Sequence, residues 1–260
     1  MNDRQSLLTE DHGAIRIVTL NRPHKRNALS LELIQDLLDA VRGTADDSKV
    51  AALIIAAAGP VFSAGHDLTQ LINRPQSDYA ELFQTCADLM LTLQQIPQPV
   101  IAEVQGIATA AGCQLVAACD LAIAATTATF ATPGVKIGLF CATPMIPLVR
   151  AIGRKRAMQM LLTGEPINAG TAADWGLINK VVEPSALRAE TLALANRIAT
   201  SSREVIATGK AAFYETIDLP DSAAYQQGSD VMTASAATRD AHEGISAFLE
   251  KRPPRWPGER

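Results

Sequence analysis

The sequence predicts an α/β fold whose first half alternates strands with helices and whose second half is mainly helical. Strand and helix patterns alternate from Gly13 to Ala125. The run from Val50 to Ala56 is continuously apolar, which fits a strand buried on both faces of a sheet flanked by helices. From Pro144 onward only helical spacing recurs. Alternation of this kind predicts repeated right-handed crossovers in the first half.

The first strand and the first helix have clear signals. Residues Gly13 to Leu20 form a β-branched run behind a glycine, which predicts a strand. Ser30 is a good N-cap residue and precedes apolar residues at helical spacing, so we expect a helix to begin there. Its apolar positions are Leu31, Ile34, Leu37, Leu38 and Val41.

The remaining elements follow in chain order. After the apolar strand, a helix fits residues 79–95, and Pro97 and Pro99 end it. Strands at 100–104 and 121–125 lie on either side of a helix of small residues at 110–118. In the second half we predict helices at about 144–151, 154–162, 169–175, 186–200, 202–214 and 222–236.

Composition and charge exclude several classes of protein. A net charge of −4 argues against a general nucleic-acid binder, which usually has a basic excess. No stretch of 18 apolar residues occurs, so we expect no membrane span. The four cysteines lack metal-binding spacing, which predicts buried thiols in a reducing compartment. The polar start does not resemble a secretory signal, so the cytoplasm is the default expectation. They are Cys86, Cys113, Cys119 and Cys141.

Three glycine-containing segments follow predicted strands. They are Phe62–Leu68, Gly106–Leu115 and Phe130–Leu139. Each one alone is more often a tight turn than a functional site. Their order and spacing together are far more specific.

In that order and spacing, the segments resemble the crotonase (enoyl-CoA hydratase/isomerase) superfamily along almost the whole chain. Within it, the third segment is most similar to the group named enoyl-CoA hydratase domain-containing protein 3. The similar positions are Leu20–Pro23, Asn27–Leu29, Phe62–Asp67, Gly106–Asp120, Thr163, Gly164, Ala172, Gly176, Leu177, Val181, Val182, Glu243–Phe248, Lys251 and Arg252.

The resemblance implies a fold, a ligand and an assembly. The fold is the ClpP-like crotonase spiral of ββα units, with a spiral core at 1–200 that holds an acyl-CoA site and a helical trimerisation region at 201–260. The ligand is an acyl-CoA thioester, in which coenzyme A is part of the substrate and no separate cofactor or metal is expected. The assembly is a homotrimer or homohexamer. A eukaryotic member whose presequence has been removed would lie in the mitochondrial matrix.

The same resemblance places two oxyanion donors in this chain. Chemistry beside a thioester puts negative charge on the carbonyl oxygen, and backbone N–H groups aimed at that oxygen stabilise the enolate. The motif assigns one donor to the amide of His66 and the other to the amide of Ala111. Ala111 would begin the small-residue helix, whose dipole also favours an anion.

Contacts to coenzyme A also follow from the resemblance. His24, Lys25 and Arg26 fall where the family contacts the nucleotide or phosphates, although each charge could equally be a solvated surface group. Phe248 and Lys251 fall where a neighbouring subunit completes the site. Further expected contacts are Ala64, Asp67, Leu68, Gly112, Gly134 and Phe140. Asp67 is also a good candidate to cap the following turn.

Two positions depart from the pattern of a hydratase. Hydratases activate water with two glutamates, and the corresponding residues here are Gln114 and Gly134. Gln114 can form hydrogen bonds but cannot act as a base, and glycine has no side chain. His66 is the leading replacement base, although its ring could instead only pack on the ligand. Related decarboxylases share this histidine but have a tyrosine where this chain has Phe140.

Several functions therefore stay open. The first is an enzyme of the enoyl-CoA hydratase type, a lyase or isomerase that uses an oxyanion hole. Alternatives within that class are a decarboxylase of malonyl-type acyl-CoA and an acyl-CoA thioesterase. A catalytically silent acyl-CoA binder is the alternative from another class. A doubly wound nucleotide-binding fold is disfavoured because no G-x-G-x-x-G follows the first strand.

Overall fold

Consecutive strands of this protein are divided between two sheets. The computed structural model describes residues 5–257. The larger sheet contains β1 (Leu7–His12), β2 (Ile15–Leu20), β3 (Ala52–Ala57), β5 (Val100–Val104), β7 (Leu121–Ala125) and β10 (Lys180–Val182), in that order across the sheet. The smaller sheet contains β4 (Val61–Ser63), β6 (Ile107–Thr109), β8 (Thr129–Ala131) and β9 (Ile167–Asn168), also in that order.

The helices follow pairs of strands. Before the C-terminal region they are α1 (Leu31–Ala45), α2 (Gln76–Gln95), α3 (Ala111–Ala118), α4 (Met145–Ile152), α5 (Arg154–Thr163), α6 (Ala169–Trp175) and α7 (Leu187–Ala199). Short 3-10 turns are η1 (Pro23–Lys25), η2 (Leu68–Leu71), η3 (Pro133–Ile137) and η4 (Pro184–Ala186). In three successive repeats, β3–β4–α2, β5–β6–α3 and β7–β8–α4, one strand joins each sheet and a helix follows. This is the ββα spiral that the sequence predicts.

Parallel pairing in the smaller sheet determines where the functional segments meet. Strand β6 pairs with β4 on one side, with Ser63 opposite Ala108. It pairs with β8 on the other side, with Thr109 opposite Ala131. Because the strands are parallel, their carboxyl ends lie at the same edge. The three glycine-containing segments therefore come together, although many residues separate them in sequence.

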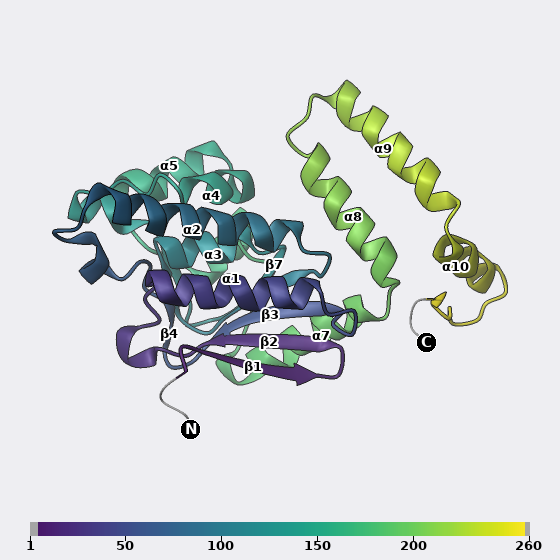
Figure 1. Ribbon diagram of the computed structural model, residues 1–260, viewed down its shortest axis with the longest axis horizontal. Helices are drawn as coiled ribbons and strands as arrows, with labels where there is room; N and C mark the ends of the chain where they lie inside the picture. The colour runs from purple at the N-terminus through teal and green to yellow at the C-terminus, as the bar shows by residue number, and fades with distance from the viewer. Residues whose placement is uncertain (1–4, 258–260) are drawn as a thin grey trace.

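The larger sheet is buried on both faces. Strand β3 pairs in parallel with β2 and β5. Leu53 and Ile55 point into the main core beneath α1, whereas Ala52 and Ile54 belong to a second cluster that packs against α7. Figure 1 shows α7 across the sheet from α1 and α2. The prediction of a strand buried on both faces is confirmed.

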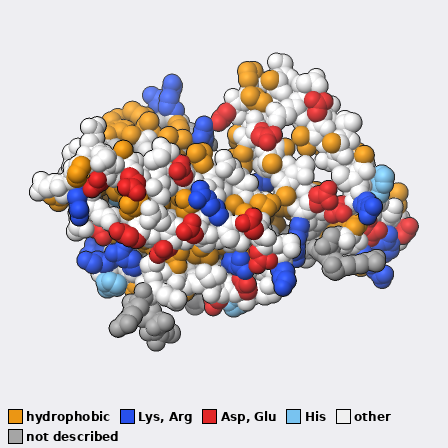
Figure 2. Space-filling view, viewed as in Figure 1, with side chains coloured by type: hydrophobic (Ala, Val, Ile, Leu, Met, Phe, Trp, Pro, Cys, Tyr) orange, Lys and Arg blue, Asp and Glu red, His pale blue; other side chains and the backbone are white. Residues whose placement is uncertain are grey.

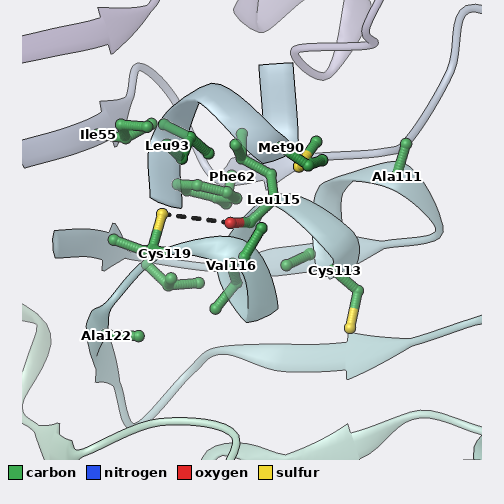
Figure 3. Packing of buried hydrophobic residues seen from close by; sticks show 14 of the residues in the cluster. Ile55, Phe62, Met90, Leu93, Ala111, Cys113, Leu115, Val116, Cys119 and Ala122 are labelled. Carbon is green, nitrogen blue, oxygen red and sulfur yellow. Dashed lines mark hydrogen bonds between the residues drawn. The ribbon is translucent and has the colours of Figure 1, made fainter. Parts of the chain in front are cut away.

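Helix α3 passes through the main core. Its residues Leu115 and Val116 are fully buried beside Phe62 of β4, as Figure 3 shows. The thiol of Cys119 at the end of α3 donates to the carbonyl of Leu115 at 3.2 Å. The small side chains of α3 allow this close packing between helix and strand, and the four cysteines are free and buried.

Most predicted elements agree with the structure. Ser30 caps α1, since its hydroxyl accepts from the amide of Leu33. Helix α2 begins at Gln76 rather than Tyr79, because its first turn is exposed and lies outside the apolar pattern. The prediction missed β1, the short strands β4, β6, β8, β9 and β10, and the last helix.

The C-terminal region is helical, as expected, and extends from the body of the molecule. It consists of α8 (Arg203–Thr216), α9 (Asp221–Ala236) and α10 (Arg239–Leu249). Figure 1 shows α9 and α10 reaching away from both sheets. Within residues 5–257, no helix is both long and apolar enough to cross a membrane.

Candidate active site

The loop that follows β4 is held in place through its backbone. The amides of Ala64 and Asp67 donate to the carbonyls of Arg26 and Leu29 at 3.0 and 3.1 Å. Hydrogen bonds to the segment before α1 thus fix the backbone of the loop at 62–68. This explains why the Asn27–Leu29 signature and the Phe62–Asp67 signature occur in the same chain.

One amide of this loop is left over. The amide of Gly65 donates to the hydroxyl of Ser63 at 3.3 Å, and that hydroxyl donates to the carbonyl of Asn27 at 2.9 Å. The amide of His66 has no acceptor among residues 5–257. The amide of His66 is therefore free between the bonded amides of Gly65 and Asp67.

A second free amide lies at the start of α3. The first amide inside this helix to find an acceptor is that of Gln114, which donates to the carbonyl of Ala110 at 2.9 Å. The amides of Ala111, Gly112 and Cys113 precede it and have no acceptor in the described part of the chain, as is usual in the first turn of a helix, and that of Ala111 is the one nearest the loop after β4. Ala110 has φ 50° and ψ −117°, a conformation that is unfavourable for a residue with a side chain. This torsion orients the peptide that carries the Ala111 N–H.

The two free amides belong to turns that touch. A Cβ atom added to Gly65 would lie 2.9 Å from the Cβ of Ala110 and 3.4 Å from the nitrogen of Ala111. Gly65 has φ +88°, which also favours glycine. Only glycine allows the loop after β4 to approach the first turn of α3 this closely. The amides of His66 and Ala111 are thereby brought to one edge of the smaller sheet.

A mainly apolar cavity opens beside these turns. Its volume is about 370 Å³, within the usual range for small-molecule sites. The sequence predicted six of its lining residues, namely Ala64, His66, Leu68, Ala111, Gly134 and Phe140. Cys141 and Thr143, polar residues to which the sequence assigns no role, also line it. The lining residues that the sequence analysis missed are Leu71, Phe83, Ala110, Pro133, Lys136, Ile137, Leu139, Ala142 and Pro144.

The ring of His66 forms part of the cavity wall. Its Nδ1 lies 3.4 Å from the carbonyl oxygen of Leu29, which can only accept, so Nδ1 carries the proton in this contact. Its Nε2 is buried without a partner in the described chain. The ring meets Phe83 edge-on, with centroids 5.3 Å apart. Burial lowers the pKa of His66 below its usual range, so the ring is neutral near pH 7.

The two positions where a hydratase has glutamates have different surroundings. Gln114 is 3% exposed and does not line the cavity, and its Oε1 has no partner in the described residues. A Cβ on Gly134 would lie 2.0 Å from the carbonyl oxygen of Leu139 and 2.8 Å from the Sγ of Cys141. The backbone around Gly134 therefore leaves no room for a glutamate.

Two other titratable groups line the cavity. Burial raises the pKa of the Cys141 thiol, which therefore stays protonated near neutral pH. The ammonium group of Lys136 lies 2.7 Å from a carboxylate oxygen of Glu165. Among the lining side chains, only the imidazole of His66 is an uncharged base at neutral pH.

Several residues predicted to contact coenzyme A lie outside the cavity. His24, Lys25 and Arg26 are exposed in and after η1. Phe248 and Lys251 lie at the end of α10, far along the C-terminal region in Figure 1, and do not reach the cavity within one chain.

Asp67 and Gly112 have structural contacts. Asp67 accepts from the amide of Thr69 at 3.2 Å, which confirms that it caps the turn, and it lies 3.5 Å from Arg22. A Cβ on Gly112 would lie 2.4 Å from the carbonyl of Ser63, so a glycine is needed where α3 packs on β4.

The chain is similar to many known proteins. A model of the enoyl-CoA hydratase/isomerase family matches residues 10–259. "Enoyl-CoA hydratase domain-containing protein 3, mitochondrial" of Danio rerio is 48% identical over 98% of this chain and 89% of the relative, and that of Homo sapiens is 49% identical over 94% and 81%. The "2,3-dehydroadipyl-CoA hydratase" of Escherichia coli is 35% identical over 97% and 98%.

Solved structures agree in fold. An enoyl-CoA hydratase of Mycobacterium smegmatis has a TM-score of 0.95 and 45% identity, covering 97% of this chain and 99% of that one. The human enoyl coenzyme A hydratase domain-containing protein 3 has a TM-score of 0.95 and 46% identity, covering 97% and 100%. These similarities confirm the crotonase fold that the sequence predicts.

Proposed function

Because this chain belongs to the enoyl-CoA hydratase/isomerase family, we propose that it binds an acyl-CoA thioester in the cavity beside α3 and enolises it. Two of the amides without acceptors, those of His66 and Ala111, carry this proposal because their turns are in contact. They belong to touching turns at the edge of an apolar cavity. A buried N–H group left without a partner is costly, and a thioester oxygen bound there would satisfy both.

The chemistry expected of this pair is stabilisation of an enolate. Loss of a proton from the carbon next to the thioester moves negative charge onto the carbonyl oxygen. Fixed amides of His66 and Ala111 stabilise that oxygen more in the transition state than in the ground state. The N-terminal end of α3 contributes its dipole in the same direction.

Standard hydration is not the reaction that we propose. It requires two carboxylates to hold and activate water, and this chain has Gln114 and Gly134 at the corresponding positions. The close packing around Gly134 argues that the loop is built for glycine. The reaction that remains is proton transfer at the α-carbon.

We assign the proton transfer to His66. Its Nδ1 faces the carbonyl of Leu29, which leaves the lone pair on Nε2 available as a base. Lys136 is paired with Glu165, and the buried thiol of Cys141 is protonated. His66 would thus provide a base from its ring and an oxyanion donor from its backbone.

Exchange of α-protons tests this function without assuming a final product. Butyryl-CoA is incubated with the protein in D2O, and deuterium incorporation is followed by mass spectrometry. We expect exchange in the natural protein and at least a hundredfold loss in His66→Phe. His12→Phe is the matched control, because His12 is exposed on β1 and does not line the cavity. Ala111→Pro removes one donor at the first position of α3 and should cost about 10²–10³ in rate, and circular dichroism must show that the variant folds, because proline restricts the preceding residue and Ala110 has φ 50°.

The outcomes separate the competing functions. Turnover of crotonyl-CoA at an ordinary hydratase rate would refute the argument about the missing glutamates. Tight binding with no exchange would identify a silent binder. Release of CO2 from malonyl-type substrates, or of free thiol, would identify a decarboxylase or a thioesterase. Normal exchange by a well-folded Ala111→Pro variant would refute the oxyanion assignment.

Location and assembly belong to the same proposal. The mitochondrial names of the vertebrate relatives support the matrix as the compartment of a eukaryotic chain without its presequence. Membership in the family supports a homotrimer or homohexamer, in which Phe248 and Lys251 would approach the cavity of a neighbouring subunit.

A further inference from the structure

Most of the residues that line the cavity are apolar. Leu71 comes from η2, Phe83 from α2, and Phe140 and Pro144 from the loop between η3 and α4. These side chains offer no hydrogen-bond donor to a ligand. An acyl group that extends from the free amides into this space meets carbon atoms on most of its surface.

One cationic side chain, Lys136, lines the cavity, and its charge is already paired with the carboxylate of Glu165. Its ammonium group lies 2.7 Å from Glu165, with side chains 48% and 69% exposed. The stem of Lys136 also packs closely on the turn after α5, because a Cβ on Gly164 would lie 3.1 Å from its Cε. This packing and the ion pair direct the ammonium group to Glu165 rather than to a bound ligand.

From these walls we infer that the cavity accepts acyl groups with a neutral, apolar far end and selects against acyl groups that carry a second carboxylate. The inference rests on the proposed function and names the substrate class of the same site. A buried carboxylate without a partner is strongly disfavoured, whereas a methyl end gains from burial. Glu165 acts as a specificity-determining residue, because it neutralises Lys136.

Matched acyl-CoA pairs test the inference by binding alone. Isothermal titration calorimetry compares butyryl-CoA with succinyl-CoA, and hexanoyl-CoA with adipyl-CoA. Each pair has the same chain length and differs in a methyl or carboxylate end. Free coenzyme A provides the baseline. We expect the methyl member of each pair to bind at least tenfold more tightly.

Two variants of the ion pair test the role of Glu165. Glu165→Gln frees the charge of Lys136, so the carboxylate member of each pair should bind more tightly. The gap, meaning the ratio of the dissociation constants of the carboxylate and methyl members, should narrow several-fold. Lys136→Gln is the matched control, because it removes the cation and should leave the gap at least as wide. A gap that is the same in both variants would overturn the role of Glu165.

The remaining outcomes distinguish failure of this inference from failure of the proposed function on which it rests. Equal binding of methyl and carboxylate members overturns the substrate class while leaving the proposed function standing. Failure of every acyl-CoA to bind more tightly than free coenzyme A overturns the proposed function, and the inference with it.

Discussion

At the scale of single residues, His66 uses its backbone and its ring for different tasks. The loop after β4 leaves its amide free, while burial against Phe83 keeps its ring neutral. The contact between Nδ1 and Leu29 fixes which nitrogen holds the proton. Both tasks depend on the conformation of the loop after β4. A substitution of the His66 ring therefore also tests the surroundings of the backbone amide.

The lowered pKa of His66 predicts a pH dependence of stability. In the unfolded chain the ring has an ordinary pKa of about 6.5. As the pH falls below that value, the unfolded state takes up a proton before the folded state does, so the free energy of unfolding decreases. The loss is at most about 1.4 kcal/mol per pH unit, until the folded pKa is reached. Above pH 6.5 the contribution is fully present.

Urea unfolding at pH 7.5 and pH 5.5 measures this effect. His66→Phe should lose less stability between the two pH values than the natural protein does, by at most about 1.4 kcal/mol. His12→Phe, at an exposed position on β1, should behave like the natural protein. An identical loss in the natural protein and in His66→Phe would contradict a ring buried in its neutral form.

The sequence could predict the residues at the turns of the site but not most of its walls. His66, Ala111 and Gly134 lie in glycine-containing segments with recognisable spacing. Phe83 lies in a helix, where one more apolar residue indicates only core packing. Its place beside the His66 ring depends on how α2 lies over η2, which is a tertiary property. The close packing that excludes a side chain at Gly134 is likewise visible only in the structure.

At the scale of elements, local signals account for the long helices and strands but not for the smaller sheet. Strands β4, β6 and β8 contain three residues each. Three residues are too few for an alternating pattern to emerge. Parallel pairing with distant segments, rather than local preference, makes them strands. This sheet nevertheless carries the site. The sequence therefore predicted the site from its motifs and not from predicted strands.

Helix α8 is attached to the core by a charged side chain. The Lys210 ammonium group lies 2.7 Å from Asp120 and also donates to the carbonyls of Leu93 and Gln98, at 2.7 and 2.8 Å. Tyr214, one turn later on α8, donates to the same carboxylate at 2.7 Å. The Lys210 side chain is only 7% exposed, so solvent screens this pair weakly.

Replacing this lysine should therefore be costly. Lys210→Met removes the cation beside the Asp120 carboxylate, which keeps its hydrogen bonds from Tyr214 and the amide of Val100, and it takes a donor from two carbonyls. We expect a loss of about 3 kcal/mol in the free energy of unfolding. Tyr214→Phe removes one hydrogen bond and should cost about 1 kcal/mol. Urea unfolding measures both values, and hydrogen exchange should show faster opening of α8 in Lys210→Met. A loss below that of Tyr214→Phe would contradict this attachment.

At the scale of the whole molecule, the C-terminal region leaves large apolar side chains uncovered. Helices α9 and α10 reach away from the sheets, and Figure 2 shows hydrophobic side chains exposed along α8 and α9. Tyr225 is 81% exposed and Phe248 is 82% exposed. Large apolar side chains that a single chain leaves in water in this way usually mark an interface. The arrangement supports the trimerisation region that the sequence predicts.

We therefore predict that this region joins chains into an assembly that also completes the site. Light scattering coupled to size exclusion should give three or six times the 27.6 kDa mass of one chain. Phe248→Asp places a charge where an apolar contact is expected, and should release single chains that bind butyryl-CoA at least tenfold more weakly. Leu8→Asp, on the exposed edge strand β1, is the matched control and should change neither. If the natural protein is a single chain at micromolar concentration, or if Phe248→Asp assembles and binds normally, the exposed face of α10 has another role.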